Sequence, residues 1–201
     1  MLKAHALACA RGERTLFKDL SFQVGAGELL YVRGENGVGK TSLLRLLVGL
    51  AKPVAGEIKW NGKPLAQCRE LFLKDTLYLG HHAALKGELS ALENLKFSAA
   101  IDGVQLQEAQ AYSALAMFGL KGRECLPVEW LSAGQKRRVL LARLVLRNAK
   151  LWILDEPLNA LDVKATQFLL DMIRDHLQSQ GAVIMTSHQS FDLPNVKELV
   201  L

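Results

Sequence analysis

The stretch Gly34-Glu35-Asn36-Gly37-Val38-Gly39-Lys40-Thr41 decides the fold of this 201-residue chain. It fits the pattern G-x-x-x-x-G-K-[ST], in which glycines let the backbone turn tightly and bring its N–H groups to a phosphate. A helix that begins directly after such a loop points the positive end of its dipole at the same place. The phosphate loop, residues 34–41, therefore predicts a nucleotide site, with Lys40 on the terminal phosphates and Thr41 on Mg²⁺.

The residues on either side of the phosphate loop supply the elements that the pattern requires. Residues 28–32 (Glu-Leu-Leu-Tyr-Val) are mostly apolar and predict a buried strand that enters the loop. Residues 42–50, which begin with Ser42, have the spacing of a helix that leaves it, and Gly49 is suited to end that helix. This context separates a phosphate site from a chance glycine turn.

Composition limits the class of protein. Half of the residues are hydrophobic and 22% are charged, which predicts a globular chain. The net charge of +5 is spread out, and its tightest cluster, Lys136-Arg137-Arg138, is more typical of a solvated helix face than of a nucleic-acid site. Three scattered cysteines, Cys9, Cys68 and Cys125, indicate reduced thiols in a cytosolic compartment. No apolar run approaches the roughly 18 residues of a membrane span, so attachment to a membrane is expected through another protein.

The pattern of elements changes along the chain. Alternating residues within 2–24 predict antiparallel strands, and Asn61-Gly62 predicts a hairpin turn after a short strand. A capping box, Ser90 with Glu93, predicts a helix over 91–101, and a second helix is expected over 106–118. The region from 82 to 130 therefore reads as a helical insertion into an α/β core.

Two further segments carry chemistry. The signature segment, Leu131-Ser132-Ala133-Gly134-Gln135, precedes a predicted helix that extends to about residue 147, and its small and hydroxyl side chains at a helix start suit an anion. The apolar run 151–154 ends in a carboxylate pair, Asp155 and Glu156, of which one can hold Mg²⁺ through water while the other polarises an attacking water. The buried strand 182–185 leads to His188, which we expect at the same sheet edge.

These segments together resemble the ATPase subunits of ABC transporters. The phosphate loop, the signature segment, the carboxylate pair, residues 159–162 (Asn-Ala-Leu-Asp) and His188 match that family in order and spacing along essentially the whole chain. The resemblance implies an α/β fold: a RecA-like P-loop NTPase core with an N-terminal antiparallel β part and a helical subdomain. It places residues 1–81 and 131–201 in the β-subdomain and core, and residues 82–130 in the helical subdomain that faces a membrane partner.

The resemblance also implies roles for individual residues. ATP is expected on Gly34, Glu35, Asn36, Gly37, Val38, Gly39, Lys40, Thr41 and Ser42, with Ser132, Gly134, Gln135 and Asp162 acting across a head-to-tail homodimer. Thr41 and Asp155 would hold Mg²⁺. Glu156 would be the catalytic base, and His188 would contact the γ-phosphate.

Two positions depart from the common pattern. His81 stands where these ATPases have a glutamine, and imidazole brings a proton equilibrium near neutral pH. The hypothesis that coupling falls as His81 protonates would fail if His81→Gln left the pH profile unchanged; the alternative is a spacer histidine without a ligand role. Arg11 stands where an aromatic residue stacks on adenine, and its guanidinium can stack on a purine or simply lie at the surface.

A narrower resemblance is to the heme-exporter ATPases of bacterial cytochrome c maturation. It rests on His81 and on residues 131–139 (Leu-Ser-Ala-Gly-Gln-Lys-Arg-Arg-Val) and 151–157 (Leu-Trp-Ile-Leu-Asp-Glu-Pro). It implies integral membrane partners that are CcmB-like and CcmC-like, and a peripheral location at the cytoplasmic face of the inner membrane. The motif Cys-x-x-Cys-His is absent, so no direct heme binding is expected.

Three alternatives stay open from the sequence. The first is the ATPase of another ABC exporter, for a lipid or a drug, because a cytosolic subunit holds no substrate contacts. The second is an ABC-type ATPase that acts on nucleic acid, although a long coiled-coil insertion or two cassettes would not fit in 201 residues. The third is a non-catalytic subunit, against which the intact Lys40, Asp155, Glu156 and His188 argue. No nucleic-acid partner is expected.

Overall fold

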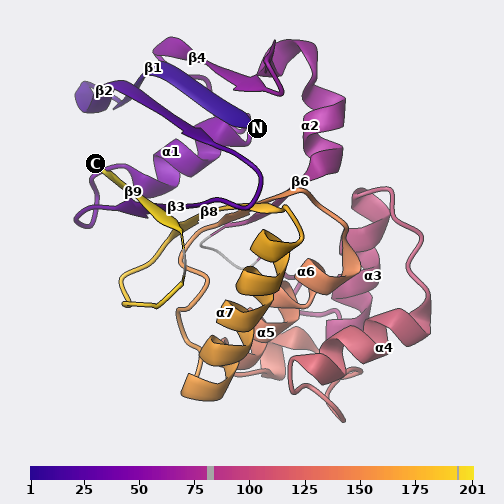
Figure 1. Ribbon diagram of the computed structural model, residues 1–201. Coiled ribbons are helices and arrows are strands. Elements are labelled where there is room, and N and C mark those ends of the chain that lie inside the picture. The colour runs from indigo at the N-terminus through magenta and orange to yellow at the C-terminus, as the bar shows by residue number, and fades with distance from the viewer. Residues whose placement is uncertain (81–83, 194) are drawn as a thin grey trace. The chain divides into compact units, whose positions relative to one another are not determined.

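The computed structural model describes residues 1–80, 84–193 and 195–201, and Figure 1 shows its elements. The chain divides into two compact units. The first comprises residues 1–78, 149–156 and 170–201, and the second comprises residues 79–148 and 157–169. Residues 131–148, which the sequence analysis grouped with the core, fall in the second unit, where their helices pack against the helices of the 82–130 region.

One sheet of the first unit is antiparallel. It has the order β2-β1-β4-β5, with β1 (Leu2–Arg11), β2 (Arg14–Val24), β4 (Ala55–Trp60) and β5 (Lys63–Pro64). Asn61 and Gly62 both have positive φ, 49° and 81°, and Trp60 pairs with Lys63 across them. This is the two-residue hairpin that Asn-Gly predicts, because both central residues must adopt left-handed backbone conformations.

The second sheet is built around parallel strands. Its order is β6-β7-β8-β3-β9, with β6 (Thr76–Leu79), β7 (Leu151–Leu154), β8 (Ala182–Thr186), β3 (Leu29–Arg33) and β9 (Val196–Val200). β3 is parallel to β8 and β9, and β7 is parallel to β8. The phosphate loop, the carboxylate pair and His188 follow β3, β7 and β8, so all three leave the sheet at one edge.

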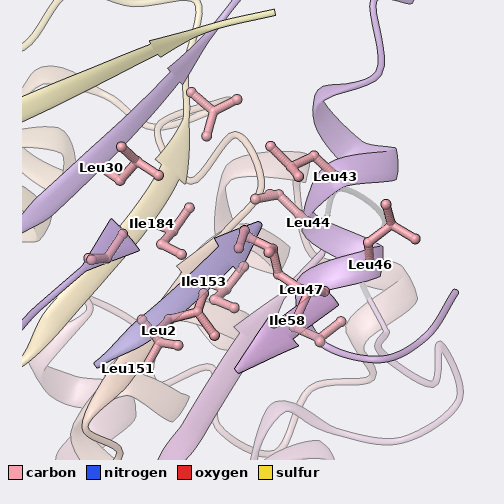
Figure 2. Close-up of a cluster of buried hydrophobic side chains, with 14 of the residues drawn as sticks. Leu2, Leu30, Leu43, Leu44, Leu46, Leu47, Ile58, Leu151, Ile153 and Ile184 are labelled. Atoms are coloured by element: carbon pink, nitrogen blue, oxygen red, sulfur yellow. The ribbon is translucent and has the colours of Figure 1, made fainter. Parts of the chain in front are cut away.

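Helix α1 (Lys40–Leu47) lies between the two sheets (Figure 1). Figure 2 shows its leucines packed among side chains from both sheets, Leu2 and Ile58 of the antiparallel sheet and Ile153 and Ile184 of the parallel one. Burial of each such side chain contributes about 1.5–3 kcal/mol. The helix that follows the phosphate loop is therefore anchored by the main hydrophobic core of this unit.

The second unit is helical. It contains α3 (Ala91–Ile101), α4 (Glu108–Met117), α5 (Ala133–Leu141) and α6 (Arg143–Leu146). The capping box at Ser90 and Glu93 is present as predicted. The single helix expected up to residue 147 is divided at Ala142. Beyond this break, Arg143 and Arg147 both pair with Asp102, at 3.3 and 3.1 Å, which fixes the direction of α6.

Two helices lie outside the sequence predictions, α2 (Arg69–Asp75) and α7 (Val163–Gln178). Short 3₁₀ helices, η1 (Leu65–Gln67) and η2 (Val128–Trp130), complete the elements. No helix within the described ranges is long and apolar enough to cross a membrane. The three cysteines are free thiols, with Cys9 buried and Cys125 exposed.

Candidate nucleotide site

The phosphate loop joins β3 to α1 through three glycines with positive φ. Gly34, Gly37 and Gly39 have φ values of 147°, 79° and 121°. A Cβ on Gly34 would lie 2.8 Å from the Val38 side chain, and one on Gly39 would lie 3.2 Å from Leu16, whereas Gly37 faces open space. At Gly34 and Gly39, backbone conformation and packing together require glycine, whereas at Gly37 backbone conformation alone favours it.

Lys40 is the cation that this loop encloses. Its ammonium donates to the carbonyl of Gly34 at 2.8 Å and to that of Glu35 at 3.1 Å. The residue is 8% exposed, and no ion pair among the described residues involves it. A buried ammonium held by carbonyls and next to a helix N-terminus lacks the counter-charge that burial demands. The residues present therefore fit a bound polyphosphate.

The carboxylate pair is organised by one hydroxyl at the end of β8. Thr186 Oγ1 donates to Asp155 Oδ1 at 2.9 Å and accepts from the backbone N–H of Glu156 at 2.8 Å. Asp155 and Glu156 are 1% and 6% exposed. Glu156 has φ 51°, a left-handed conformation that costs a non-glycine residue about 1–2 kcal/mol. The hydrogen bond from Glu156 N–H to Thr186 supports that conformation.

The structure brings His188 to Glu156. The backbone N–H of His188 donates to Glu156 Oε2 at 3.1 Å, and the imidazole Nε2 lies 3.4 Å from Oε1. Tyr31, on the neighbouring strand β3, donates its hydroxyl to the carbonyl of Ser187 at 2.8 Å and fixes the turn that carries His188. The structure therefore places His188 at the edge of the parallel sheet that the phosphate loop also leaves, and adds a contact with Glu156 that the sequence did not predict.

Mg²⁺ would find oxygen ligands in the same unit. Thr41 lies exposed in the first turn of α1, and Asp155 lies at the end of β7. The charge of Asp155 is felt by a neighbouring residue, Tyr78: burial raises the pKa of the Tyr78 phenol, and the negative charge of Asp155 raises that pKa further. Protein Mg²⁺ sites commonly use one or two carboxylates together with phosphate oxygens and water, which this donor set fits.

The signature segment forms a closed capping box. Ser132 Oγ accepts from the N–H of Gln135 at 3.3 Å, and Gln135 Oε1 accepts from the N–H of Ser132 at 2.9 Å. A Cβ on Gly134 would lie only 2.6 Å from the carbonyl oxygen of Ala160. The sequence suggested that a small residue is needed at Gly134 so that a phosphate can approach. The structure shows that the fold of this chain already requires glycine there, because the 159–162 loop passes directly over Gly134.

Asp162 is held by its own chain as well. It forms an ion pair with Arg138 of α5 and accepts from the N–H of Ala165 at 2.8 Å, which caps the start of α7. The hydrogen bond from Ala165, together with the charge of Arg138, lowers the pKa of this carboxyl. The signature helix and the 159–162 loop are therefore linked twice, at Gly134 and at Arg138.

The interpretation of residues 136–138 as a solvated face is wrong for Arg137. Arg137 is 7% exposed and donates to the carbonyls of Pro157 at 3.2 Å and Gly80 at 3.4 Å. Arg138 is engaged by Asp162. Because Arg137 is committed to backbone carbonyls and Arg138 to a carboxylate of the same chain, the cluster gives little support to a nucleic-acid partner.

Two predicted residues were singled out as departures from the family pattern. His81 lies outside the described residues. Arg11 is exposed at the end of β1, and its cross-strand neighbour is Arg14. Sequence reasoning missed the roles of Thr186, Tyr31 and Arg137. The place of Thr186 follows from strand register, because pairing of Leu154 with Met185 in adjacent parallel strands places Asp155 beside the next residue of β8.

Comparison with known proteins gives matches along the whole chain. The family model of ABC transporters matches residues 17–159. The cytochrome c biogenesis ATP-binding export protein CcmA of Dechloromonas aromatica is 51% identical over 203 residues, covering 100% of both chains. The protein of the same name from Escherichia coli K12 is 49% identical over 98% of this chain and 93% of its own.

Solved structures agree on the fold. A putative ABC transporter ATP-binding protein from Pyrococcus furiosus superposes with a TM-score of 0.85 at 26% identity, covering 100% of this chain and 96% of its own. The ATP-binding cassette MJ0796, in a dimeric post-hydrolysis state bound to ADP and Pi, gives a TM-score of 0.82 at 22% identity, covering 94% and 88%.

Proposed function

The chain belongs to the ABC transporter family and, within it, to the cytochrome c biogenesis ATP-binding export proteins, and we propose that it hydrolyses ATP to drive heme export for c-type cytochrome assembly. The observation that carries the hydrolytic part is the contact of Glu156 with His188, at the sheet edge from which the phosphate loop also departs. A subunit that only bound nucleotide would not need this pair.

In the proposed mechanism the chain's own residues divide the work. The phosphate loop and Ser42 bind the phosphates of ATP, with Lys40 on the terminal ones and Arg11 near the adenine. Thr41 and Asp155 would hold Mg²⁺, which supplies neutralisation of phosphate charge when bound. Glu156 accepts a hydrogen bond from the attacking water and draws its proton. His188 lies against Glu156 and contacts the γ-phosphate.

The active form that we propose is a head-to-tail homodimer. Ser132, Gly134 and Gln135 of one copy would close over the ATP held by the other, and Asp162 would lie across the contact. The internal links from Gly134 to Ala160 and from Arg138 to Asp162 support this arrangement, because they make the signature segment and the 159–162 loop one presenting surface. The dimeric state of MJ0796 is a precedent in the same fold.

Coupling to a membrane would run through the helical region. We propose that residues 82–130 meet integral membrane subunits, CcmB-like and CcmC-like, at the cytoplasmic face of the bacterial inner membrane. The ATPase itself would not bind heme. Dimer closure and reopening would then be passed to those subunits and to release of a periplasmic heme chaperone.

The deciding experiment measures c-type cytochromes in cells. A host deleted for this gene is complemented with the wild-type gene or with Glu156→Gln, and its membranes are stained for covalently bound heme. We expect the wild type to restore the heme-stained bands and Glu156→Gln, expressed to the same level, to leave them absent. Normal cytochromes in the deletion strain would disprove heme export and leave an ABC ATPase of another exporter.

A further inference from the structure

Thr186 is a residue beside the carboxylate pair for which the sequence predicted no role. It is the last residue of β8, its side chain is fully buried, and its hydroxyl lies between the two carboxylate residues at the end of β7. We propose that Thr186 is a positioning residue for hydrolysis, which orients Asp155 toward the metal and Glu156 toward the attacking water. This inference rests on the proposed ATPase function.

The chemistry of the hydroxyl fixes the direction of both hydrogen bonds. The backbone N–H of Glu156 can only donate, so the single proton of Thr186 Oγ1 is left for Asp155 Oδ1, at 2.9 Å. The lone pairs that remain accept the backbone N–H of Glu156, at 2.8 Å. One atom therefore contacts the side chain of Asp155 and the backbone of Glu156 at the same time.

The backbone of Glu156 shows why such support is needed. Its φ of 51° is a conformation that L-residues leave readily unless neighbouring contacts hold them. This backbone turn directs the Glu156 carboxylate to His188, whose N–H reaches Oε2 at 3.1 Å. Loss of the hydroxyl would release the backbone at the residue whose carboxylate must be aimed.

The hydroxyl and the methyl group of Thr186 can be removed one at a time, which allows a clean test. Thr186→Val keeps the shape and removes the hydroxyl, whereas Thr186→Ser keeps the hydroxyl and removes the methyl group. Ile184→Val, two residues earlier in the same buried strand, is a matched control for a lost methyl group away from the polar site. All four proteins are prepared in complex with their membrane subunits. Phosphate release is measured against ATP and against Mg²⁺ concentration, and half-saturation by Mg²⁺ is also measured by calorimetry with a non-hydrolysable ATP analogue bound.

The expected results separate positioning from folding. Thr186→Val should lower kcat by about 10- to 100-fold, the usual effect of removing a group that orients a metal ligand. Its KM for ATP should stay within about twofold of the wild-type value, since the phosphate loop is untouched, while half-saturation by Mg²⁺ should shift to higher concentration. Thr186→Ser and Ile184→Val should retain wild-type kcat within about threefold.

Other outcomes are equally definite. Wild-type kcat and Mg²⁺ dependence in Thr186→Val would overturn the inference, and so would a Thr186→Ser protein as impaired as Thr186→Val. If Thr186→Val fails to fold, Thr186→Cys is measured instead. Its kcat is expected to be lower than that of Thr186→Ser but above zero. A wild-type kcat in Thr186→Cys would overturn the inference. A wild-type complex without ATPase activity would instead disprove the proposed function.

Discussion

At the scale of single residues, the glycines of this chain have different physical reasons. Gly34 and Gly39 are demanded by backbone conformation and by neighbours of the phosphate loop. Gly134 has an ordinary backbone conformation, and only the carbonyl of Ala160, 2.6 Å from where a Cβ would stand, excludes a side chain there. The glycine of the signature segment thus shapes the subunit itself, before any second copy approaches.

Gly134→Ala is therefore expected to destabilise the isolated chain. A methyl group at that position forces the 159–162 loop to move, and overpacking of this kind costs about 1–3 kcal/mol in the free energy of unfolding. Urea unfolding measures it. The matched control is Gly87→Ala in the same unit, where the new Cβ would meet Glu129 at an ordinary 3.6 Å and stability should change little. Equal stabilities of the two variants would show that Gly134 is kept only for the nucleotide.

Much of the site was predictable at this scale, and the exceptions share a cause. The phosphate loop, Asp155, Glu156 and His188 belong to contiguous patterns, so their spacing alone indicates their places. Thr186, Tyr31 and Arg137 act through contacts with residues that are distant in the chain, such as Tyr31 with Ser187 and Arg137 with Pro157. Contacts of that kind depend on strand order and helix packing, which the motifs do not encode.

At the scale of elements, sequence periodicity succeeded where one face of an element is buried. The helix over 91–101 was predicted with its correct bounds because a capping box marks its start. Helix α2 has exposed leucines, Leu71 and Leu73, and β9 is an edge strand with charged residues, so neither shows a clear apolar face. Helix α7 is the exception: Leu169, Ile173 and Leu177 form a buried face at helical spacing, yet no helix was predicted there.

The end of α7 is joined to β7 by a stacked pair. The ring of His176 lies 3.8 Å from that of Trp152, with 3° between their planes. A Cβ on Gly181 would lie 2.2 Å from the imidazole, so glycine there leaves room for the ring. Burial lowers the pKa of His176 from 6.5 to about 4, and the folded protein therefore holds this histidine neutral.

This pair predicts a loss of stability in mild acid. Between pH 6.5 and about 4 the unfolded chain binds a proton at His176 that the folded chain does not, so the stabilisation present above pH 6.5 falls as pH falls through this window. For a partly screened ring we expect a loss of about 1–2 kcal/mol. Urea unfolding from pH 7.5 to 4.5 measures it.

Two variants identify the source of the pH dependence. His176→Phe keeps an aromatic ring against Trp152 and removes the titration, so its stability should vary less with pH in this window. His5→Ala removes an exposed histidine of β1 and should leave the slope unchanged. A slope in His176→Phe equal to that of the wild type would assign the acid sensitivity to other groups.

At the scale of the whole molecule, the proposed site residues are divided between the two units. The phosphate loop, the carboxylate pair and His188 belong to residues of the first unit, whereas Ser132, Gly134 and Asp162 belong to the second. In the proposed dimer, each nucleotide would be held by the first unit of one copy and covered by the second unit of the other. Hydrolysis would then require association, and association would require nucleotide.

The last prediction concerns that association. Glu156→Gln should retain Mg-ATP without hydrolysing it and should elute as a dimer in size-exclusion chromatography with light scattering. Ser132→Arg in the same background should bind ATP equally well but stay monomeric, because Ser132 lies outside the phosphate loop and the added guanidinium would block the covering surface. Lys40→Ala should fail at the earlier step and bind no nucleotide.

A monomeric Glu156→Gln protein that becomes dimeric only with the membrane subunits would assign pairing to those subunits. Loss of ATP binding in Ser132→Arg would show that the signature segment belongs to the site of its own chain.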